Sequence, residues 1–356
     1  MISSIIEAGS GSPIKERKQA MKKRVFGTLP SGNEIIEYTL RTESAEAGII
    51  TLGATVTHLT VSGINVILGF ERLEDYLADR SRQGTIIGRY ANRIKNGHFS
   101  LNGTEYTLVK NSGNNHIHGG TIGFDRRIWT VESASDTELT LSLDSYDGEE
   151  GYPGNLHVTL VYRLCGSSLS IDYTATSDAD TVCNLTNHSY FNLNGCGNGD
   201  VKGHRMLLFA QRYSKVDAEL IPTGEHPEVT GTPLDFLTVH TIGERLGEEF
   251  AGYDHNYILT PSEHREVCGY ELPIVAVAEG DRLRMTVLTD QPCIQLYTPR
   301  GFSAGGPNFR GGYEKLPFAG FCLEAQLEPD SPNNGVFLRA GETYRHTTVY
   351  SLTERT

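Results

Sequence analysis

The sequence predicts an all-β protein, folded as one large single-domain antiparallel β-sandwich. Segments in which apolar and polar residues alternate recur at short spacing from Ile49 onward, and they are rich in Thr, Val, Ile and Tyr. No strand–helix–strand alternation interrupts them, and no Pro/Ser-rich linker or change of composition follows residue 24. The length of 356 residues alone leaves one or two domains open, so this pattern decides for one.

The predicted strands follow one another along the chain and are joined by short turns. Asn102-Gly103 lies between two alternating runs and is the strongest hairpin signal in the sequence, while Ala340-Gly341-Glu342 makes a second connection. Only residues 73–80 have a helical pattern. The predicted strand segments are 49–61, 98–109, 129–133, 139–145, 156–164, 169–177, 283–289, 294–298 and 336–352.

The N-terminal residues differ from the rest of the chain. Residues 1–23 are polar and charged, with Gly9, Gly11 and Pro13 near the start and a Lys/Arg cluster at the end. Such a segment is typical of a solvated terminus. We therefore predict a poorly ordered N-terminal extension over 1–23 and the β-sandwich domain over 24–356.

Composition excludes several classes of function. The 31 Lys and Arg residues against 44 Asp and Glu residues give a formal charge of −13, which argues against a nucleic-acid partner. No run approaches the roughly 20 apolar residues of a membrane span, and the N-terminus lacks the order of a secretory signal. The six cysteines form no CxxC pair, which favours free thiols. We predict a cytoplasmic protein without a membrane partner.

Nucleotide, serine-hydrolase and metal motifs are not found in the sequence. There is no G-x-x-x-x-G-K-[ST] loop, no strand-linked G-x-G-x-x-G and no G-x-S-x-G elbow. His116 and His118 would point to one face of a strand, and His188 with a carboxylate would complete a metal site. However, residues 119–123 read GGTIG where a cupin-type site has its glutamate, so we predict no bound metal.

Polar clusters beside apolar strand segments mark the candidate site. Taken alone, an arginine in such a cluster is read as a structural ion-paired residue, and a lone histidine as a structural one. Glu324 is different, because a carboxylate in an apolar stretch is costly to bury and needs a partner or a task. The clusters are 88–94 (GRYANRI), 114–120 (NNHIHGG), 184–193 (NLTNHSYFNL), 252–257 (GYDHNY) and 321–326 (FCLEAQ).

Together, these clusters supply imidazoles, carboxylates and an arginine with amide and aromatic companions. This set suits proton transfer on a neutral polyhydroxylated ligand, since vicinal hydroxyls are held by bidentate hydrogen bonds and sugar faces stack on aromatic rings. The sequence therefore indicates a small-molecule monosaccharide site.

The motifs also carry a resemblance, in their order along the chain, to the aldose 1-epimerase (galactose mutarotase) family. The resemblance spans roughly residues 24–353 and implies the large β-sandwich of that family, the galactose mutarotase-like supersandwich, with a sugar site on one face and no cofactor. The motifs are GFERLEDYL, GRYANRI, NNHIHGG with GFDRRIW, NLTNHSYFNL, LIPTGE with TPLDF, GYDHNYIL and CLEAQLEPDSPN.

Roles carried over from the family give the predicted site. The resemblance implies that Glu324 is the catalytic base and His188 the general acid, and that His116 is structural. Ala325 and Leu327-Glu328 depart from the usual last motif, which leaves the sugar preference open. The implied sugar-binding residues are Asn92, Arg93, His118, Asp254 and Gln295.

Three alternatives to a free-hexose 1-epimerase remain at this stage. A noncatalytic carbohydrate-binding β-sandwich would use the same contacts without an acid–base pair. A glycoside hydrolase would use Glu324 and Asp254 as its two carboxylates. A hexose-6-phosphate 1-epimerase would need extra cations at one end of the sugar, for which Arg126, Arg127, Arg300 and Arg310 are candidates. We expect a monomer or weak homodimer that interconverts anomers of free hexoses such as glucose and galactose.

Overall fold

The computed structural model describes residues 21–302 and 306–355 and consists mainly of antiparallel strands. Of the predicted N-terminal extension, residues 1–20 lie outside the described residues, and the first strand, β1, begins at Lys22. The boundary between extension and domain therefore stays a prediction.

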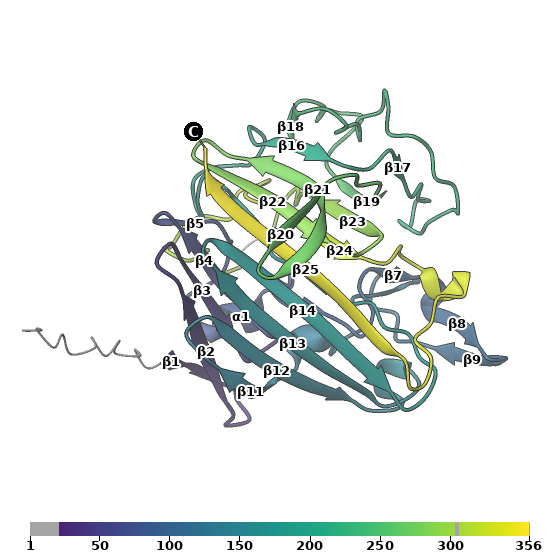
Figure 1. Cartoon of the computed structure of the whole chain (residues 1–356). Coiled ribbons are helices and arrows are strands. Elements are labelled where there is room, and N and C mark those ends of the chain that lie inside the picture. The colour runs from purple at the N-terminus through teal and green to yellow at the C-terminus, as the bar shows by residue number, and fades with distance from the viewer. Residues whose placement is uncertain (1–20, 303–305, 356) are drawn as a thin grey trace, which may run out of the picture.

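The largest layer is a ten-stranded sheet that crosses the whole molecule (Figure 1). The C-terminal strand β25 lies inside this sheet, between β14 and β22, and joins its two halves. The order of the strands is β11 (Thr130–Ala134), β12 (Glu138–Ser145), β13 (Leu156–Cys165), β14 (Ser168–Ser177), β25 (Thr343–Glu354), β22 (Leu283–Thr289), β21 (Tyr270–Glu279), β16 (Arg205–Leu208) and β18 (His240–Thr241), with β20 (His264–Val267) also paired to β21.

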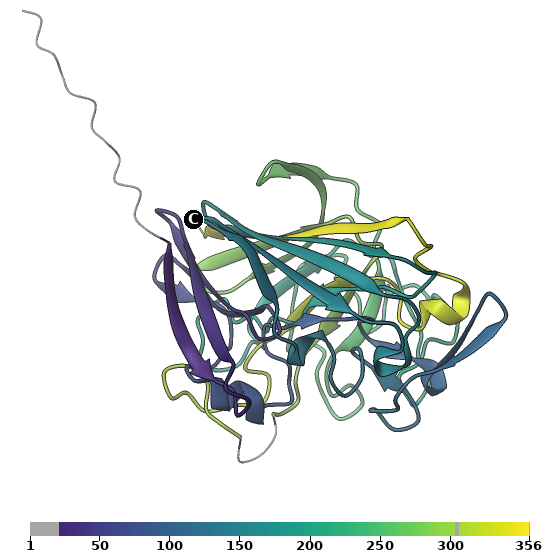
Figure 2. The ribbon, with the colours of Figure 1, turned by 90° about the horizontal axis from the view of Figure 1, so that it is seen from below.

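A second layer faces the ten-stranded sheet and is made of shorter sheets (Figure 2). Its five-stranded part packs β2 and β3 against β12 and β13. The five strands are β1 (Lys22–Thr28), β2 (Glu34–Arg41), β3 (Ala45–Ile50), β4 (Thr55–Val61) and β5 (Ile64–Asn65). The four-stranded sheet consists of β17 (Arg212–Tyr213), β19 (Asp254–Ile258), β23 (Cys293–Tyr297) and β24 (Cys322–Gln326).

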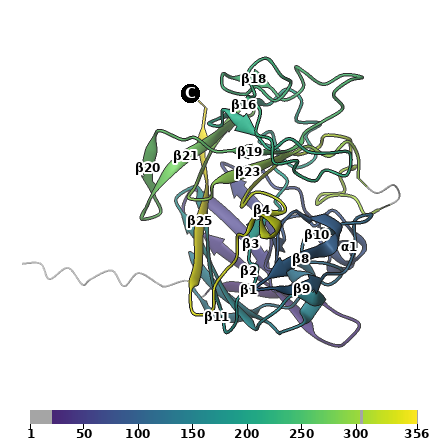
Figure 3. The ribbon, with the colours of Figure 1, turned by 90° about the vertical axis from the view of Figure 1, so that its right-hand side faces the viewer.

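Three two-stranded pairs and a few short helical turns complete the structure. In the side view, α1, β8, β9 and β10 lie together, away from β25 (Figure 3). The pairs are β6 (Ile86–Ile87) with β15 (Thr186–Asn187), β7 (Arg93–Ile94) with β10 (His116–Ile117), and β8 (His98–Leu101) with β9 (Thr104–Thr107). The helical segments are α1 (Leu73–Ala78), η1 (Lys95–Gly97), η2 (Phe124–Arg126), η3 (Glu149–Gly151) and η4 (Ser331–Asn334).

The main hydrophobic core lies between the two layers. Alternation places Leu141, Leu160 and Ile171 of the ten-stranded sheet on its inner face, where they join Val56 of β4 and Leu296 of β23 in one buried cluster. Fully burying each such side chain contributes roughly 1.5–3 kcal/mol, so this cluster is the main stabilising feature of the sandwich.

The predicted all-β antiparallel architecture is confirmed, as are the hairpin at Asn102-Gly103 and the helix at 73–80, which ends at Ala78. Segment 49–61 is split into two strands, because the chain turns at residues 51–54 with Ala54 at a φ of 47°. Ala340-Gly341-Glu342 forms a turn, but the preceding Leu338 bridges Thr181 and does not pair with β25. Within the described ranges, no helix has the length and apolar character needed to cross a membrane.

Candidate active site

All seven predicted site residues line one pocket with a volume of about 270 Å³. They come from segments far apart in the sequence, which the short strands of the second layer bring together. A pocket of this size is at the small end of the range for ligand sites and suits a monosaccharide. The lining residues are Arg80, Ser81, Arg82, Asn92, Arg93, Ile117, His118, His188, Tyr190, Asp254, Gln295, Tyr297, Pro299, Gly301, Phe302 and Glu324.

The register of the four-stranded sheet fixes three polar side chains of the pocket. Gln295 on β23 lies directly opposite Glu324 on β24, so the two side chains share one face of the sheet. Asp254 begins the neighbouring strand β19, and its Oδ1 accepts a hydrogen bond of 2.6 Å from Nε2 of Gln295. Three adjacent hydrogen-bonded strands thus hold a carboxylate, an amide and a second carboxylate in a fixed array.

Two hydrogen bonds join His118 to Asn92, one between backbones and one from the Asn92 backbone to the His118 ring. The His118 N–H donates to the Asn92 carbonyl and the Asn92 N–H donates to Nδ1 of His118, both at 3.1 Å. Because Nδ1 accepts this bond, the neutral His118 ring carries its proton on Nε2. Both residues have positive φ values, 53° for His118 and 65° for Asn92, and such strained backbone is concentrated at functional sites.

Gly119 allows the chain to make this turn. A Cβ at Gly119 would lie 1.7 Å from the Gly88 carbonyl oxygen, and the φ of Gly119 is 79°. Only glycine fits both the conformation and the close approach. The Gly-Gly pair after His118 therefore sets where the imidazole lies.

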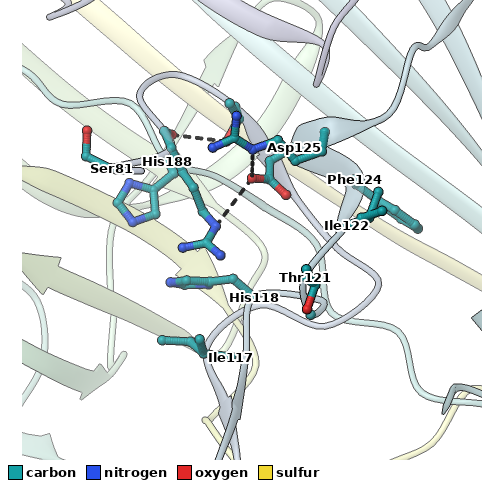
Figure 4. Close-up of polar contacts among 12 residues, drawn as sticks. Ser81, Ile117, His118, Thr121, Ile122, Phe124, Asp125 and His188 are labelled. Carbon is teal, nitrogen blue, oxygen red and sulfur yellow. Dashed lines mark hydrogen bonds and ion pairs between the residues drawn. The ribbon is translucent and has the colours of Figure 1, made fainter. Parts of the chain in front are cut away.

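His188 follows β15 and faces both the carboxylate and several aromatic rings. Its Nε2 lies 3.8 Å from Oε2 of Glu324, and its Nδ1 lies 3.6 Å from Sγ of Cys322. The His118 and His188 rings are 5.5 Å apart and nearly perpendicular, and Figure 4 shows the two imidazoles close to each other. The Tyr190 ring lies 5.0 Å from the His188 ring.

Burial shifts the titration of the two central groups in opposite directions. Burial, together with the charge of Asp254, raises the pKa of Glu324 to about 8, against lowering by Arg93 and Arg82. Burial and the charge of Arg82 lower the pKa of His188 to about 4. Groups with shifts of this kind in a pocket are typical of acid–base sites.

Two buried oxygen atoms of the pocket have no hydrogen-bond partner among residues 21–302 and 306–355. These are Oε2 of Glu324 and Oε1 of Gln295, on residues that are 2% and 4% exposed. A buried acceptor without a donor costs about 1–3 kcal/mol. A ligand that donates hydrogen bonds, as a sugar hydroxyl does, would satisfy both.

The sequence reasoning missed several residues that line the pocket. Tyr190 and Tyr297 had a usable signal, since they belong to the segments NLTNHSYFNL and QPCIQLYT already considered. Arg80, Ser81 and Arg82 had none, because they belong to a turn after α1 that reaches the pocket only in the folded chain.

Other polar residues singled out in the sequence are structural. Arg89 is buried and donates to Ser145 and to the carbonyls of Pro153 and Gly154. His116 is buried, with Nε2 2.5 Å from the Tyr152 hydroxyl. The four cations considered for a phosphate, Arg126, Arg127, Arg300 and Arg310, are outside the lining of this pocket.

His118, His188 and Glu324 also form the one group in the described part of the chain with the composition of a metal site. Their potential ligand atoms lie within 4.8 Å of one another, and two imidazoles with a carboxylate are a donor set that suits zinc. The positive charge of Arg82, which acts on all three groups, opposes a dication there. The prediction of no bound metal stays a prediction.

Fold and pocket together define a β-sandwich protein whose small polar pocket places an imidazole beside a carboxyl group, an arrangement that suits acid–base chemistry. The sequence model of aldose 1-epimerase matches residues 37–351. Galactose mutarotase of Rattus norvegicus is 39% identical over 344 residues, covering 94% of this chain and 98% of that protein. Aldose 1-epimerase of Escherichia coli (strain K12) is 35% identical over 336 residues, covering 88% and 95%. The chain belongs to the aldose 1-epimerase family.

Solved structures agree with this assignment. Galactose 1-epimerase from Lactobacillus acidophilus NCFM has a TM-score of 0.83 at 28% identity, over 95% of this chain and 100% of that one. An aldose epimerase homologue from C. elegans has a TM-score of 0.81 at 25% identity, over 90% and 100%. Both likenesses extend over 90% or more of this chain.

Proposed function

We propose that this protein is an aldose 1-epimerase that interconverts the α and β anomers of free hexoses such as glucose and galactose. The observation that carries the proposal is the pair His188 and Glu324, buried side by side with 3.8 Å between Nε2 and Oε2, at a sugar-sized pocket. Relatives named galactose mutarotase and aldose 1-epimerase support it.

Ring opening needs one base and one acid. The Glu324 carboxylate takes the proton of the O1 hydroxyl, while the His188 imidazolium gives its proton to the ring oxygen O5. The C1–O5 bond breaks and the C1–O1 bond becomes the carbonyl of the open-chain aldehyde. Each positioned acid or base contributes roughly 10²–10⁴ in rate.

Ring closure uses the same two residues with their roles exchanged. Rotation about C1–C2 presents the other face of the aldehyde to the O5 hydroxyl. His188 removes the O5 proton, O5 bonds to C1, and Glu324 returns its proton to O1. The product is the opposite anomer and both side chains regain their starting protonation, so the cycle needs no co-reactant.

The number of protons on the pair fits this cycle. With a pKa of about 4 for His188 and about 8 for Glu324, the pair holds one proton between these values. One proton is what ring opening requires: with two, no base is present, and with none, His188 would have to give up its ring N–H and become an anion. In the free enzyme this proton is on Glu324, which has the higher pKa, so it passes to His188, whose Nε2 lies 3.8 Å from Oε2 of Glu324, before ring opening begins.

The remaining polar residues of the pocket hold the hydroxyls. Asp254 accepts from them, and Arg93, whose Nη2 lies 3.9 Å from Oδ2 of Asp254, donates. Gln295 and Asn92 contribute amide groups, and the Nε2 proton of His118 is available near the ring oxygen. We infer these contacts from the shared pocket and from the family resemblance.

The proposal is tested by removing each proton carrier separately. We expect Glu324→Gln and His188→Asn each to reduce kcat for mutarotation of α-glucose and α-galactose by at least about 100-fold, followed by polarimetry. Glu249→Gln and His264→Asn, on exposed residues outside the pocket, are the matched controls and should keep wild-type rates. Circular dichroism checks that each variant is folded. Wild-type activity in either pocket variant would refute the assigned role.

The cytoplasmic location and the monomeric or weakly dimeric state remain our predictions. The predicted location rests on the six cysteines, whose spacing favours free thiols and therefore a reducing compartment. Sedimentation analysis at several concentrations would measure the oligomeric state directly.

A further inference from the structure

Arg82 is a pocket residue that the acid–base cycle does not use. It lines the pocket from a turn that follows α1, and its backbone φ is 55°. The turn is closed by hydrogen bonds from the Thr85 N–H and hydroxyl to the Arg82 carbonyl. This conformation is uncommon for a residue with a large side chain, which indicates that the surrounding structure holds it there.

Asp125 anchors the Arg82 side chain. Oδ2 of Asp125 lies 3.4 Å from Nε of Arg82, and the two side chains are 4% and 23% exposed. Arg126 also contacts this carboxylate, at 3.5 Å. Figure 4 shows Asp125 with these ion pairs next to His118 and His188. Asp125 belongs to the segment GFDRRIW, which carries part of the family resemblance and to which the sugar chemistry gives no task.

The positive charge of Arg82 reaches the proton-carrying groups in spite of Asp125. After burial, Arg82 is the largest cause that lowers the pKa of His188, and the same holds for His118. It also acts against the raised pKa of Glu324. A guanidinium has this effect on buried titrating groups that line the same pocket, because the few water molecules there screen its charge poorly.

We propose that Arg82, held in place by Asp125, is a positioning residue whose fixed positive charge limits how many protons the His188–Glu324 pair holds. This rests on the proposed function, in which the pair works with one proton. The guanidinium opposes a second proton on the pair, so the carboxylate and imidazole stay available as acid and base below neutral pH.

Other charged and titratable groups also face the pair, and the effect of Arg82 adds to theirs. Asp254 and Asp79 favour protonation, and Arg93 opposes it. The groups come from the turn after α1 (Asp79, Arg82), from β7 (Arg93), from the residue after β10 (His118), from the segment after β15 (Tyr190), from β19 (Asp254), from β23 (Tyr297) and from β24 (Cys322).

Arg80 offers a matched comparison for Arg82. It has the same charge, lies two residues away and lines the same pocket, but it is exposed to solvent. Exposed charges are screened by water and salt, so its charge has little effect on the buried pair. Any difference between variants at positions 80 and 82 therefore reports the partly buried location of Arg82.

The experiment measures the pH dependence of kcat/KM for Arg82→Gln, Arg82→Lys and Arg80→Gln. We expect Arg82→Gln to move the acid limb to higher pH by about one unit, and the alkaline limb upward by less, because removing a cation raises the pKa of both groups. Arg82→Lys keeps a positive charge and should leave the limbs close to the wild-type positions. Arg80→Gln should leave them unchanged.

A second readout does not depend on catalysis. The NMR signals of the His188 ring are assigned as those that disappear in His188→Asn. The pKa read from these signals should be about one unit higher in Arg82→Gln than in the wild type. An unchanged His188 titration in Arg82→Gln would overturn the inference. An equal rise in KM at every pH, with both limbs of the pH profile in their wild-type positions, would also overturn it and would make Arg82 a sugar contact. If the wild type lacked mutarotase activity, the proposed function would fail, while the NMR titration would still decide whether Arg82 controls the pair.

Discussion

At the scale of single residues, the opposite pKa shifts of His188 and Glu324 predict a bell-shaped pH profile. The folded pair carries one proton between about pH 4 and about pH 8, so kcat/KM for the free enzyme should fall below the first value and above the second. Initial rates with α-galactose between pH 4 and 9.5, corrected for spontaneous mutarotation, measure both limbs. A rate that keeps rising above pH 9 would contradict the one-proton cycle.

Single residues of the site were predicted to different extents. Glu324 and His188 were found because each lies in a segment whose polar content is costly in an apolar strand and matches a family motif. Arg82 was not found, since its role depends on a turn that meets Asp125 and His188 only after folding. A contact between segments so far apart leaves no periodic pattern in the sequence.

At the scale of elements, the turn after β10 predicts that a single methyl group added at Gly119 greatly lowers the free energy of unfolding. In Gly119→Ala the new Cβ would collide with the Gly88 carbonyl in addition to the left-handed backbone strain, so we expect a loss of more than about 3 kcal/mol in unfolding free energy. Gly113 is the matched control, because its φ is +61° and no atom lies within 4 Å of a Cβ there. Gly113→Ala should cost about 1 kcal/mol.

Urea unfolding curves for the two variants measure this difference. Equal urea midpoints for Gly119→Ala and Gly113→Ala would show that the close approach to Gly88 does not affect the free energy of unfolding. The Gly119 variant is expected to show much the larger shift of the two, together with a lower mutarotation rate, because the adjacent His118 is displaced.

Strands were predicted where one face is buried and the other is exposed. β13 alternates between buried and accessible residues along its length, and the sequence segment 156–164 was identified correctly. β24 is buried throughout and β1 is exposed at most positions, so neither has the alternation on which the prediction relied. The physical cause is position in the sandwich, since a strand that separates core from solvent alternates most clearly, although β22 and β23 were predicted while nearly all of their residues are buried.

At the scale of the whole molecule, buried neutral histidines predict loss of stability in acid. Burial lowers the pKa of His188 and His204 to about 4 and that of His346 to about 3. The unfolded chain binds protons at these residues near pH 6.5 while the folded protein does not, so stability present above pH 6.5 is lost as the pH falls towards 4. Each of the three contributes on the order of 3 kcal/mol.

Glu324 acts in the opposite sense. Its raised pKa means that the folded protein binds a proton between about pH 8 and 4.5 where the unfolded chain does not, which adds stability as the pH falls. The histidines outnumber it, so calorimetry should find a lower Tm at pH 5 than at pH 7. In His204→Gln the decrease should be smaller, and a Tm independent of pH over this range would contradict the predicted protonation states.

The place of β25 in the ten-stranded sheet has a consequence for biosynthesis. The strand that joins β14 to β22 follows all the other described strands in the chain, so a nascent chain that has not yet reached residue 343 contains two half-sheets with open edges. Unpaired strand edges recruit other chains, and folding intermediates that expose them are prone to aggregate. Translation that stops before residue 343 would therefore yield a product for chaperones and proteases to remove, even though it contains every residue that lines the pocket.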